Sequence, residues 1–175
     1  LDLVLHLGDY IYEAANVPPA SQTPGADIGR DMDPLEECRT LDQYRTRYRQ
    51  YRSDPDLQAL HANHAVLATI DDHELADNAW AAGSQEHHPD RDGPWADRQR
   101  QALQAWHEWV PSRVDPNAGQ PIWRGLDLGG LARISLLETR TTRGEPGPDR
   151  ELFGPVQRAW LDGQLAADPA PAWQV

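Results

Sequence analysis

Acidic and aromatic polar side chains follow two short aliphatic runs of this sequence, at the point where each run ends. Leu1–Leu7 is followed by Gly8–Glu13 (GDYIYE), and Val66–Ile70 is followed by Asp71–Glu74 (DDHE). Each run is short, aliphatic and bounded by polar residues, a pattern that predicts a buried β-strand. Ligands of open α/β sheets bind beyond the carboxyl ends of the strands. If the two strands are neighbours, the polar residues that follow them meet at one point.

Four of these residues, Asp9, Tyr12, Asp72 and His73, have the chemistry of a metal site. Carboxylates packed closely together repel one another unless a cation neutralises them. Oxygen ligands favour hard cations such as calcium, magnesium, manganese or ferric iron. A tyrosine phenol, with a pKa of about 10, ionises at neutral pH only beside a strong Lewis acid, a role that ferric iron fits.

Each polar segment also has a simpler interpretation. Gly8-Asp9 directly after a strand is often an ordinary turn. Asp71–Glu74 can be the solvated start of a helix, where acidic side chains are favourable. A metal site is favoured because both segments directly follow a predicted buried strand.

The composition excludes several classes of chemistry. The 16 basic residues against 28 acidic ones give a formal charge of −12, which argues against a nucleic-acid-binding or anionic-membrane surface. Every basic residue is arginine, so the chain has no Walker A lysine, Schiff-base lysine or lysine general base. The one cysteine, Cys38, can form neither an internal disulfide nor a multi-cysteine zinc site. No run approaches the roughly 18 apolar residues of a transmembrane helix, and no serine lies in a G-x-S-x-G motif.

The elements that must position these residues alternate between strands and helices, which predicts a mixed α/β domain. The length of 175 residues suits one domain, and residues 14–40, rich in proline and glycine, are predicted to be irregular. Because the chain opens inside an apolar run without a start methionine, we expect it to be a piece of a longer protein. The further predicted elements are a helix from Leu41 with Thr40 as N-cap, a helix after Asp54-Pro55, a helix over Trp95–Val110, a hairpin of Ile122–Leu128 and Leu131–Leu137, a helix from Gly154-Pro155 and a strand at Ala172–Val175.

Several other groups could bind ligands, but a structural role is the favoured interpretation of each. Asp90–Gly93 hints at a calcium loop, yet Gln101 stands where such a loop needs glutamate, so we expect a surface turn. We expect Cys38 to have no catalytic role, because its acidic stretch offers no cationic partner. The same structural interpretation is given to the loop histidines His87 and His88 (exposed), to Asp27, Asp31 and Asp33 (solvated), and to Tyr44, Tyr48, Tyr51 and the tryptophans of 95–109 (core packing).

Three motifs, taken in this order, resemble those of a known family. His6–Glu13 (HLGDYIYE), Tyr51–Leu57 (YRSDPDL) and Asp71–Glu74 (DDHE) are similar to the PhoD-like alkaline phosphatases, which belong with the calcineurin-like and purple-acid metallophosphatases. The resemblance covers nearly the whole chain, because it continues through Leu137–Arg140 (LETR) and Leu152–Gln157 (LFGPVQ) to Ala172-Trp173.

The resemblance implies an α/β/β/α sandwich with mixed sheets and a hydrolase of small-molecule phosphate mono- and diesters. It also implies secretion, or a periplasmic or cell-surface location, and the use of Fe³⁺ and Ca²⁺. On this basis Asp9 bridges two metal positions, Tyr12 binds iron as a phenolate and Asp72 ligates the second metal. His73 then faces the substrate phosphate and can protonate the leaving oxygen. Arg140 is a weaker candidate for a phosphate contact, since a plain salt bridge at a strand end is the stronger interpretation of it.

Departures from the family pattern bear on activity. The pattern has a metal-binding block before the first strand, often with a cysteine ligand, and further blocks downstream, and residues 1–175 contain neither. In addition, Gly130 and Glu138 stand where the family commonly has aspartate. We therefore expect residues 1–175 to form part of a metallophosphatase catalytic domain, with its N-terminal and C-terminal metal-binding blocks missing. The alternatives are a truncated, non-catalytic metal- or ligand-binding fragment and an acidic carbohydrate-binding module that uses its tryptophans.

Overall fold

The first sheet joins the two aliphatic runs. The computed structural model describes residues 3–15, 31–166 and 172–175. Within them, β1 (Leu3–His6) and β2 (Ala65–Ala68) pair in parallel and in register, with His6 opposite Ala68. The carboxyl ends of the two strands therefore lie side by side, and the expected meeting of the two polar segments is confirmed. Both strands end earlier than predicted.

Two capped helices connect β1 to β2. The first, α1 (Leu41–Arg52), begins at the predicted N-cap, where the side chains of Thr40 and Gln43 bond to each other's backbone N–H groups in a capping box. The second, α2 (Pro55–Asn63), begins after Asp54, whose carboxylate accepts two of its first backbone N–H groups. These local signals explain why both helices begin where the sequence predicts.

The core lies between α1, α4 (Trp95–Trp109) and the first sheet. The predicted packing role of the aromatic side chains is confirmed, although Tyr51 and Trp109 are only partly buried. A short helix, α3 (Pro89–Asp92), precedes α4, and a 3₁₀ turn, η3 (Pro116–Ala118), follows it. The buried residues of this core include Tyr44 and Tyr48 of α1, Ala102, Ala105 and Trp106 of α4, and Ala68 and Ile70 at the end of β2.

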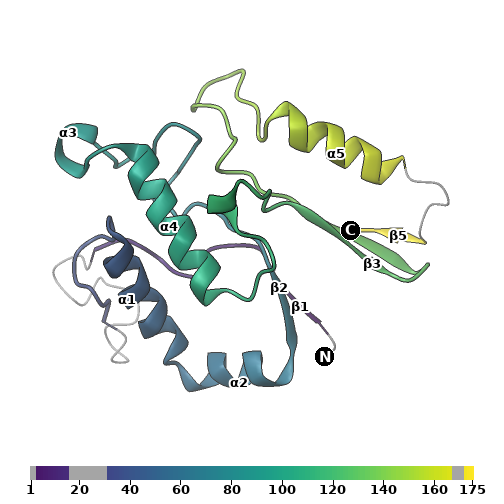
Figure 1. Ribbon diagram of the computed structural model, residues 1–175, viewed down its shortest axis with the longest axis horizontal. Coiled ribbons are helices and arrows are strands. Elements are labelled where there is room, and N and C mark those ends of the chain that lie inside the picture. Colours follow the sequence, from purple (N-terminus) through teal and green to yellow (C-terminus); the bar gives the residue numbers. More distant parts are fainter. Residues whose placement is uncertain (1–2, 16–30, 167–171) are drawn as a thin grey trace.

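The second sheet contains the predicted hairpin. The strands β3 (Arg124–Leu128) and β4 (Ala132–Leu136) are antiparallel, and β5 (Trp173–Gln174) pairs in parallel with β4. Gly129 adopts a φ of 58° in the turn between β3 and β4, a conformation that glycine adopts at little cost. The helix α5 (Pro155–Leu165) packs over this sheet (Figure 1).

The two sheets and the helices form four layers. Figure 1 shows α1, α2 and α4 on the side of the first sheet and α5 on the side of the second. Two hydrogen bonds join the sheets: the Thr69 hydroxyl donates to the carbonyl of Leu137 (2.8 Å), and the Arg124 guanidinium donates to the carbonyl of Ala68 (2.6 Å). The order helix, sheet, sheet, helix confirms the predicted α/β class and is consistent with part of an α/β/β/α sandwich.

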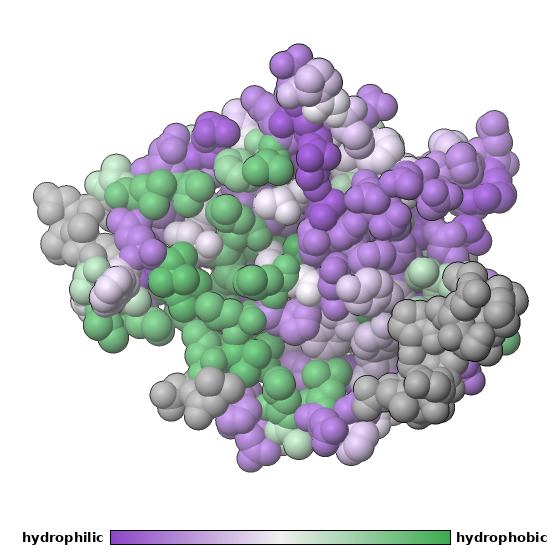
Figure 2. All heavy atoms as spheres, turned by 180° about the vertical axis from the view of Figure 1, so that it is seen from behind, coloured by the Kyte–Doolittle hydropathy of each residue, from purple (hydrophilic) through white to green (hydrophobic). Residues whose placement is uncertain are grey.

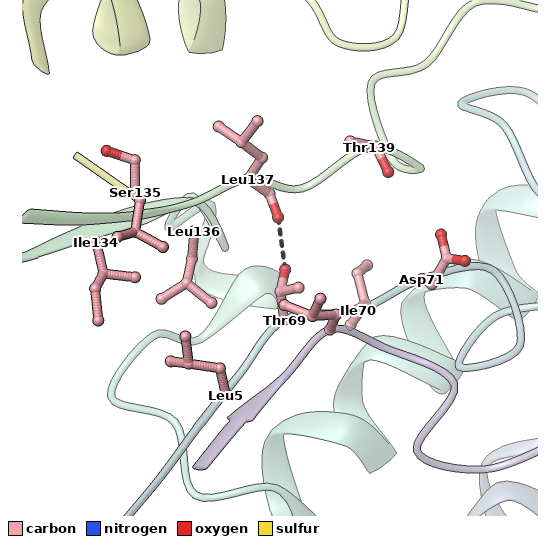
Figure 3. A pocket seen from close by; sticks show the side chains of 11 residues that line it. Leu5, Thr69, Ile70, Asp71, Ile134, Ser135, Leu136, Leu137 and Thr139 are labelled. Atoms are coloured by element: carbon pink, nitrogen blue, oxygen red, sulfur yellow. Dashed lines mark hydrogen bonds between the residues drawn. The ribbon is translucent and has the colours of Figure 1, made fainter. Parts of the chain in front are cut away.

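Apolar side chains gather on one face of the molecule. Figure 2 shows them spread in a continuous area across the middle of that face. An apolar cavity of about 280 Å³ lies between the two sheets, where Leu5 of β1 and Leu136 of β4 point toward the same space (Figure 3). Leu7 and Val175, which also line this cavity, are about two-thirds or more exposed.

The predicted irregular segment is described in part. Residues 31–40 contain neither helix nor strand, and Asp31 and Asp33 are exposed, as expected for solvated acids. Residues 16–30 of that prediction, with Asp27, Pro18, Pro19, Pro24, Gly25 and Gly29, lie outside the described residues. Across the described part of the chain, none of the helices has the length and apolar character needed to cross a bilayer.

Candidate metal centre

A strained turn presents Asp9 at the end of β1. Gly8 has a φ of 107° and Asp9 a φ of 55°, both in the region that L side chains rarely adopt. A Cβ placed on Gly8 would lie 2.3 Å from the backbone nitrogen of Asp71, so only glycine allows the two post-strand segments to approach this closely. Strained backbone of this kind concentrates at functional sites.

Asp9, Asp72 and His73 lie close enough to share a cation. Each offers one ligand atom, and these atoms all lie within 4.8 Å of one another. The Oδ1 atom of Asp9 is buried and has no hydrogen-bond partner among the described residues. Asp72 is also buried, and its Oδ2 accepts the backbone N–H of Asn78 (2.6 Å). A buried carboxylate oxygen without a partner is costly, so these residues fit a bound cation.

The phenol of Tyr12 lies beside this cluster. Its hydroxyl donates to Oδ2 of Asp9 (3.3 Å), and its ring lies against that of His73, with centroids 4.3 Å apart. Burial, and then the negative charge of Asp9, raise the pKa of Tyr12 above its usual value. The phenol is therefore neutral in this arrangement, and ionisation would require a positive charge nearby.

Glu13, which the sequence analysis missed, holds His73. Its Oε2 lies 2.7 Å from Nδ1 of His73, and its Oε1 accepts the backbone N–H of Asp77 (2.6 Å). Burial lowers the pKa of His73, but the hydrogen bond and charge of Glu13, followed by the charges of Asp72 and Asp9, raise it to about 9. The contact to Glu13 occupies Nδ1, whereas Nε2 lies 3.8 Å from Oδ1 of Asp77, beyond hydrogen-bond distance. The sequence offered only the position of Glu13 in GDYIYE, directly after Tyr12, and that position does not single it out among the nearby acids.

Glu74 fastens the two post-strand segments together. Its carboxylate accepts the backbone N–H groups of Tyr10 and Asp71, the latter at 2.7 Å. Burial raises the pKa of Glu74 to about 7, although these backbone hydrogen bonds oppose the rise. Glu74, the fourth residue of the DDHE segment, is thus buried and joins the two segments by hydrogen bonds. The alternative interpretation of this segment as the solvated start of a helix is wrong.

Arg140 forms the salt bridge that the sequence analysis favoured. Its Nε lies 2.6 Å from Oδ1 of Asp71, and its Nη2 lies 3.3 Å from Oδ1 of Asp72. The buried carboxylate of Glu138 accepts the backbone N–H of Arg140 (2.5 Å) and that of Thr141 (2.7 Å). Glu138 therefore organises the loop that carries Arg140, and the salt bridge brings the guanidinium to the edge of the metal-site cluster.

Three expectations for residues outside the cluster are wrong in whole or in part. His87 is buried rather than exposed, and its Nε2 lies 3.0 Å from the carbonyl of Gly93. Asp90 and Arg91 are exposed, as expected of a surface turn, but the turn is the helix α3 and the side chain of Asp92 is only 1% exposed, because it is enclosed in ion pairs. Cys38 does have cations nearby, Arg47 and Arg98, but burial outweighs them and raises its pKa to about 12. The thiol is consequently inert, in agreement with its predicted lack of a catalytic role.

Comparisons with known proteins agree with the family that the order of the motifs indicates. The family described as PhoD-like phosphatase matches residues 1–175. Alkaline phosphatase D of Bacillus subtilis (strain 168) is 33% identical over 192 residues, an alignment that covers 100% of this chain and 32% of that protein. A solved structure described as "Structure of PhoD" superimposes with a TM-score of 0.79 at 31% identity, covering 99% of this chain and 35% of the other. The chain thus spans about a third of the length of the relatives that it matches.

Proposed function

Because this chain belongs to the PhoD-like phosphatase family, we propose that residues 1–175 form part of the catalytic domain of a metal-dependent phosphoesterase. The reaction is hydrolysis of phosphate mono- or diesters by a metal-activated water. The observation that carries the proposal is the cluster of Asp9, Asp72 and His73, which offer ligand atoms within 4.8 Å of one another, with a buried Asp9 Oδ1 that has no hydrogen-bond partner among the described residues. Carboxylates gathered in this way favour positive charge next to them, which a bound cation would supply in addition to His73 and Arg140.

In the proposed site, Asp9, Tyr12 and Asp72 hold the ions. Asp9, whose Oδ1 has no hydrogen-bond partner among the described residues, would be the ligand that both ions share. Tyr12 supplies a phenol that ionises beside a strong Lewis acid, so we assign it to Fe³⁺, with Ca²⁺ at the second position through Asp72. Ions held there would polarise the phosphoryl oxygens and lower the pKa of a bound water.

His73 and Arg140 act on the ester itself. With Nδ1 held by Glu13, the imidazole presents Nε2 in its protonated form, which can donate a proton to the leaving oxygen. Arg140 has donor atoms beyond those that bind Asp71 and Asp72, and a guanidinium matches the geometry of phosphate oxygens.

The test uses the protein as encoded by its gene, assayed on chromogenic phosphate mono- and diesters with Fe³⁺ and Ca²⁺ supplied. We expect Asp9→Asn and Asp72→Asn to lower both activity and bound metal, with activity falling by roughly a hundredfold or more. Asp97→Asn is the matched control, because its side chain is 61% exposed on α4. Full activity in either site variant would refute the metal-site assignment.

The same measurements distinguish the alternative, a non-catalytic metal- or ligand-binding fragment. That alternative predicts stoichiometric metal in the wild type without hydrolysis of any ester. It remains a separate candidate because the chain spans 32% of its curated relative. A secreted location is proposed from the family resemblance, and fractionation of the native host into cell and medium would test it.

A further inference from the structure

A second cavity adjoins the candidate metal centre. It has a volume of about 380 Å³ and lies between the loop that follows the DDHE segment and the loop that carries Arg140. Arg140 lies between the cavity and the candidate metal centre, since it lines the cavity and its Nη2 contacts Asp72. The other polar side chains lining the cavity are Asn78, Gln85, Arg143 and Arg150.

Three arginines therefore face one small space, and only one of them is neutralised. Arg140 is paired with Asp71 and Asp72. Within the described residues, no ion pair joins Arg143 or Arg150 to a carboxylate, and the Nε of Arg143 is buried with no hydrogen-bond partner. Like charges that face one cavity repel one another, and an anion between them would offset that repulsion, although water screens the exposed Arg150.

The loop around the arginines is held in place by its own backbone. The carbonyl of Arg143 accepts the N–H of Ala81 (3.1 Å), and Gly144 donates to the carbonyl of Glu151 (3.1 Å). The Cγ of Arg150 lies 3.7 Å from where a Cβ on Gly144 would be, so Arg150 packs directly beside this backbone. The backbone that carries Arg143 and Arg150 is thus held in place before any ligand arrives, which reduces the entropic cost of binding.

Electrostatics support the same interpretation. Burial, and then the like charges of Arg140 and Arg150, lower the pKa of Arg143 from its usual value. The acids that oppose this effect, Asp71 and Asp72, are already shared with Arg140. An anion held between Arg143 and Arg150 would relieve the repulsion and partner the buried Nε atom.

We propose that this arginine-lined cavity binds a second anionic group of the substrate. The preferred esters would then carry a phosphate or carboxylate in addition to the phosphate that reacts. This inference rests on the proposed function for the position of the reacting phosphate. Arg143 and Arg150 act in recognition and do not touch the bond that breaks, whereas Arg140 lies between the two places.

Kinetics with the protein encoded by its gene test the substrate preference. The substrates are butyl phosphate and butyl phosphate bearing a terminal phosphate or a terminal carboxylate. For the two doubly anionic esters, we expect Arg143→Gln and Arg150→Gln each to lower kcat/KM by about tenfold, mainly through KM, as for loss of one charge-assisted hydrogen bond. Butyl phosphate should react equally well in both variants and in the control Arg100→Gln, whose side chain is 57% exposed. The ester that responds more strongly identifies the preferred anion.

A calorimetric titration separates this inference from the proposed function. The protein is stripped of metal with a chelator and titrated with inorganic phosphate. We expect binding in the wild type and in Arg100→Gln, and roughly tenfold weaker binding in Arg143→Gln and Arg150→Gln. Absence of binding, or equal affinity in all four proteins, overturns the inference. An equal loss of kcat/KM on all three esters in Arg143→Gln and Arg150→Gln also overturns the inference, because it shows that the two arginines have a structural role. Absence of hydrolysis refutes the proposed function, while the titration still decides whether the arginines bind an anion.

Discussion

At the residue scale, one buried carboxylate sets the protonation of the histidine in the cluster. Glu13 is 2% exposed, and one of its oxygens lies 2.7 Å from Nδ1 of His73. Hydrogen bonding and charge favour the imidazolium over the neutral ring. They therefore raise the pKa of His73 from its usual 6.5 to about 9. The proposed donor of a proton to the leaving group therefore depends on a residue that does not touch the substrate.

Replacing this carboxylate by an amide should shift the titration of His73. In metal-free protein, we expect Glu13→Gln to lower the pKa of His73 by more than one unit, since both the charge and the strongest acceptor are lost. The raised pKa means that the proton is held from acid pH up to about pH 9 in the wild type, so the variant should lose it at lower pH. NMR titration of the imidazole ring measures this directly. Glu86→Gln, at an exposed position, is the matched control, and an unchanged titration in Glu13→Gln would contradict the assigned cause.

The proximity of these residues was predictable where chain order determines it, and not where a contact formed by the fold determines it. Asp9, Tyr12, Asp72 and His73 follow two aliphatic strands, and parallel pairing of those strands is enough to bring them together. Glu13 was missed because nothing in the sequence specifies which of several acids turns toward His73. The pairing of Arg140 with Asp71 and Asp72 was foreseen only as a generic salt bridge.

At the scale of elements, ion pairs between segments far apart in the sequence hold α3 against the irregular stretch before α1. The carboxylate of Asp92 lies 2.9 Å from Nε of Arg39 and 2.8 Å from Nε of Arg91. Arg39 also pairs with Glu37, which in turn pairs with the buried guanidinium of Arg98 on α4. These linked ion pairs explain why the polar segment predicted as a surface turn encloses the side chain of Asp92.

The stability that this network provides should depend on pH. The hydrogen bond and charge of Arg91, with the charge of Arg39, hold the pKa of Asp92 well below its usual 3.8. A depressed folded-state pKa contributes stability above the unfolded-state pKa and loses it as pH falls through the folded-state value. We expect Asp92→Asn to lower the free energy of unfolding at pH 7 by about 1–2 kcal/mol, because the partners are partly exposed.

Denaturant melts from pH 7 down to pH 2 test this prediction. The difference between wild type and Asp92→Asn should stay constant down to about pH 4 and shrink below it. Asp97→Asn, in an exposed pair with Arg100, should have little effect at any pH. A difference that does not change with pH would mean that Asp92 contributes through packing and not through its charge.

Helices were predicted more closely than strands, for a physical reason. Thr40 and Asp54 are N-caps whose side chains act on the next few residues, so the sequence alone locates the starts of α1 and α2. Strand ends depend on the partner: β2 stops at Ala68 because β1 has no further residue to pair with it. The pairing of β4 with β5 joins residues about 40 positions apart, and such contacts leave no local signal.

At the scale of the whole molecule, the layers expected from the family resemblance are present, but one face is open. Apolar side chains spread across that face (Figure 2), and the cavity between the sheets opens beside Leu7 and Val175. Soluble monomers rarely expose large continuous apolar areas, which otherwise mark surfaces that another part of a protein covers. The chain spans 32% of its curated relative, and we predict that further chain covers this face in a protein of that length.

A hydrophobic dye should therefore distinguish residues 1–175 from the protein encoded by the whole gene. We expect anilinonaphthalene sulfonate to give several-fold more fluorescence per mole with the isolated chain, because the open apolar cavity and the surface around it admit the dye. Leu7→Ser should reduce that signal, since Leu7 is 74% exposed and lines the cavity. Leu35→Ser is the matched control, being 65% exposed but outside the cavity lining. Near-ultraviolet circular dichroism recorded in parallel establishes that the isolated chain is folded. Equal fluorescence from the folded isolated chain and the whole protein would show that the apolar face is left open in both.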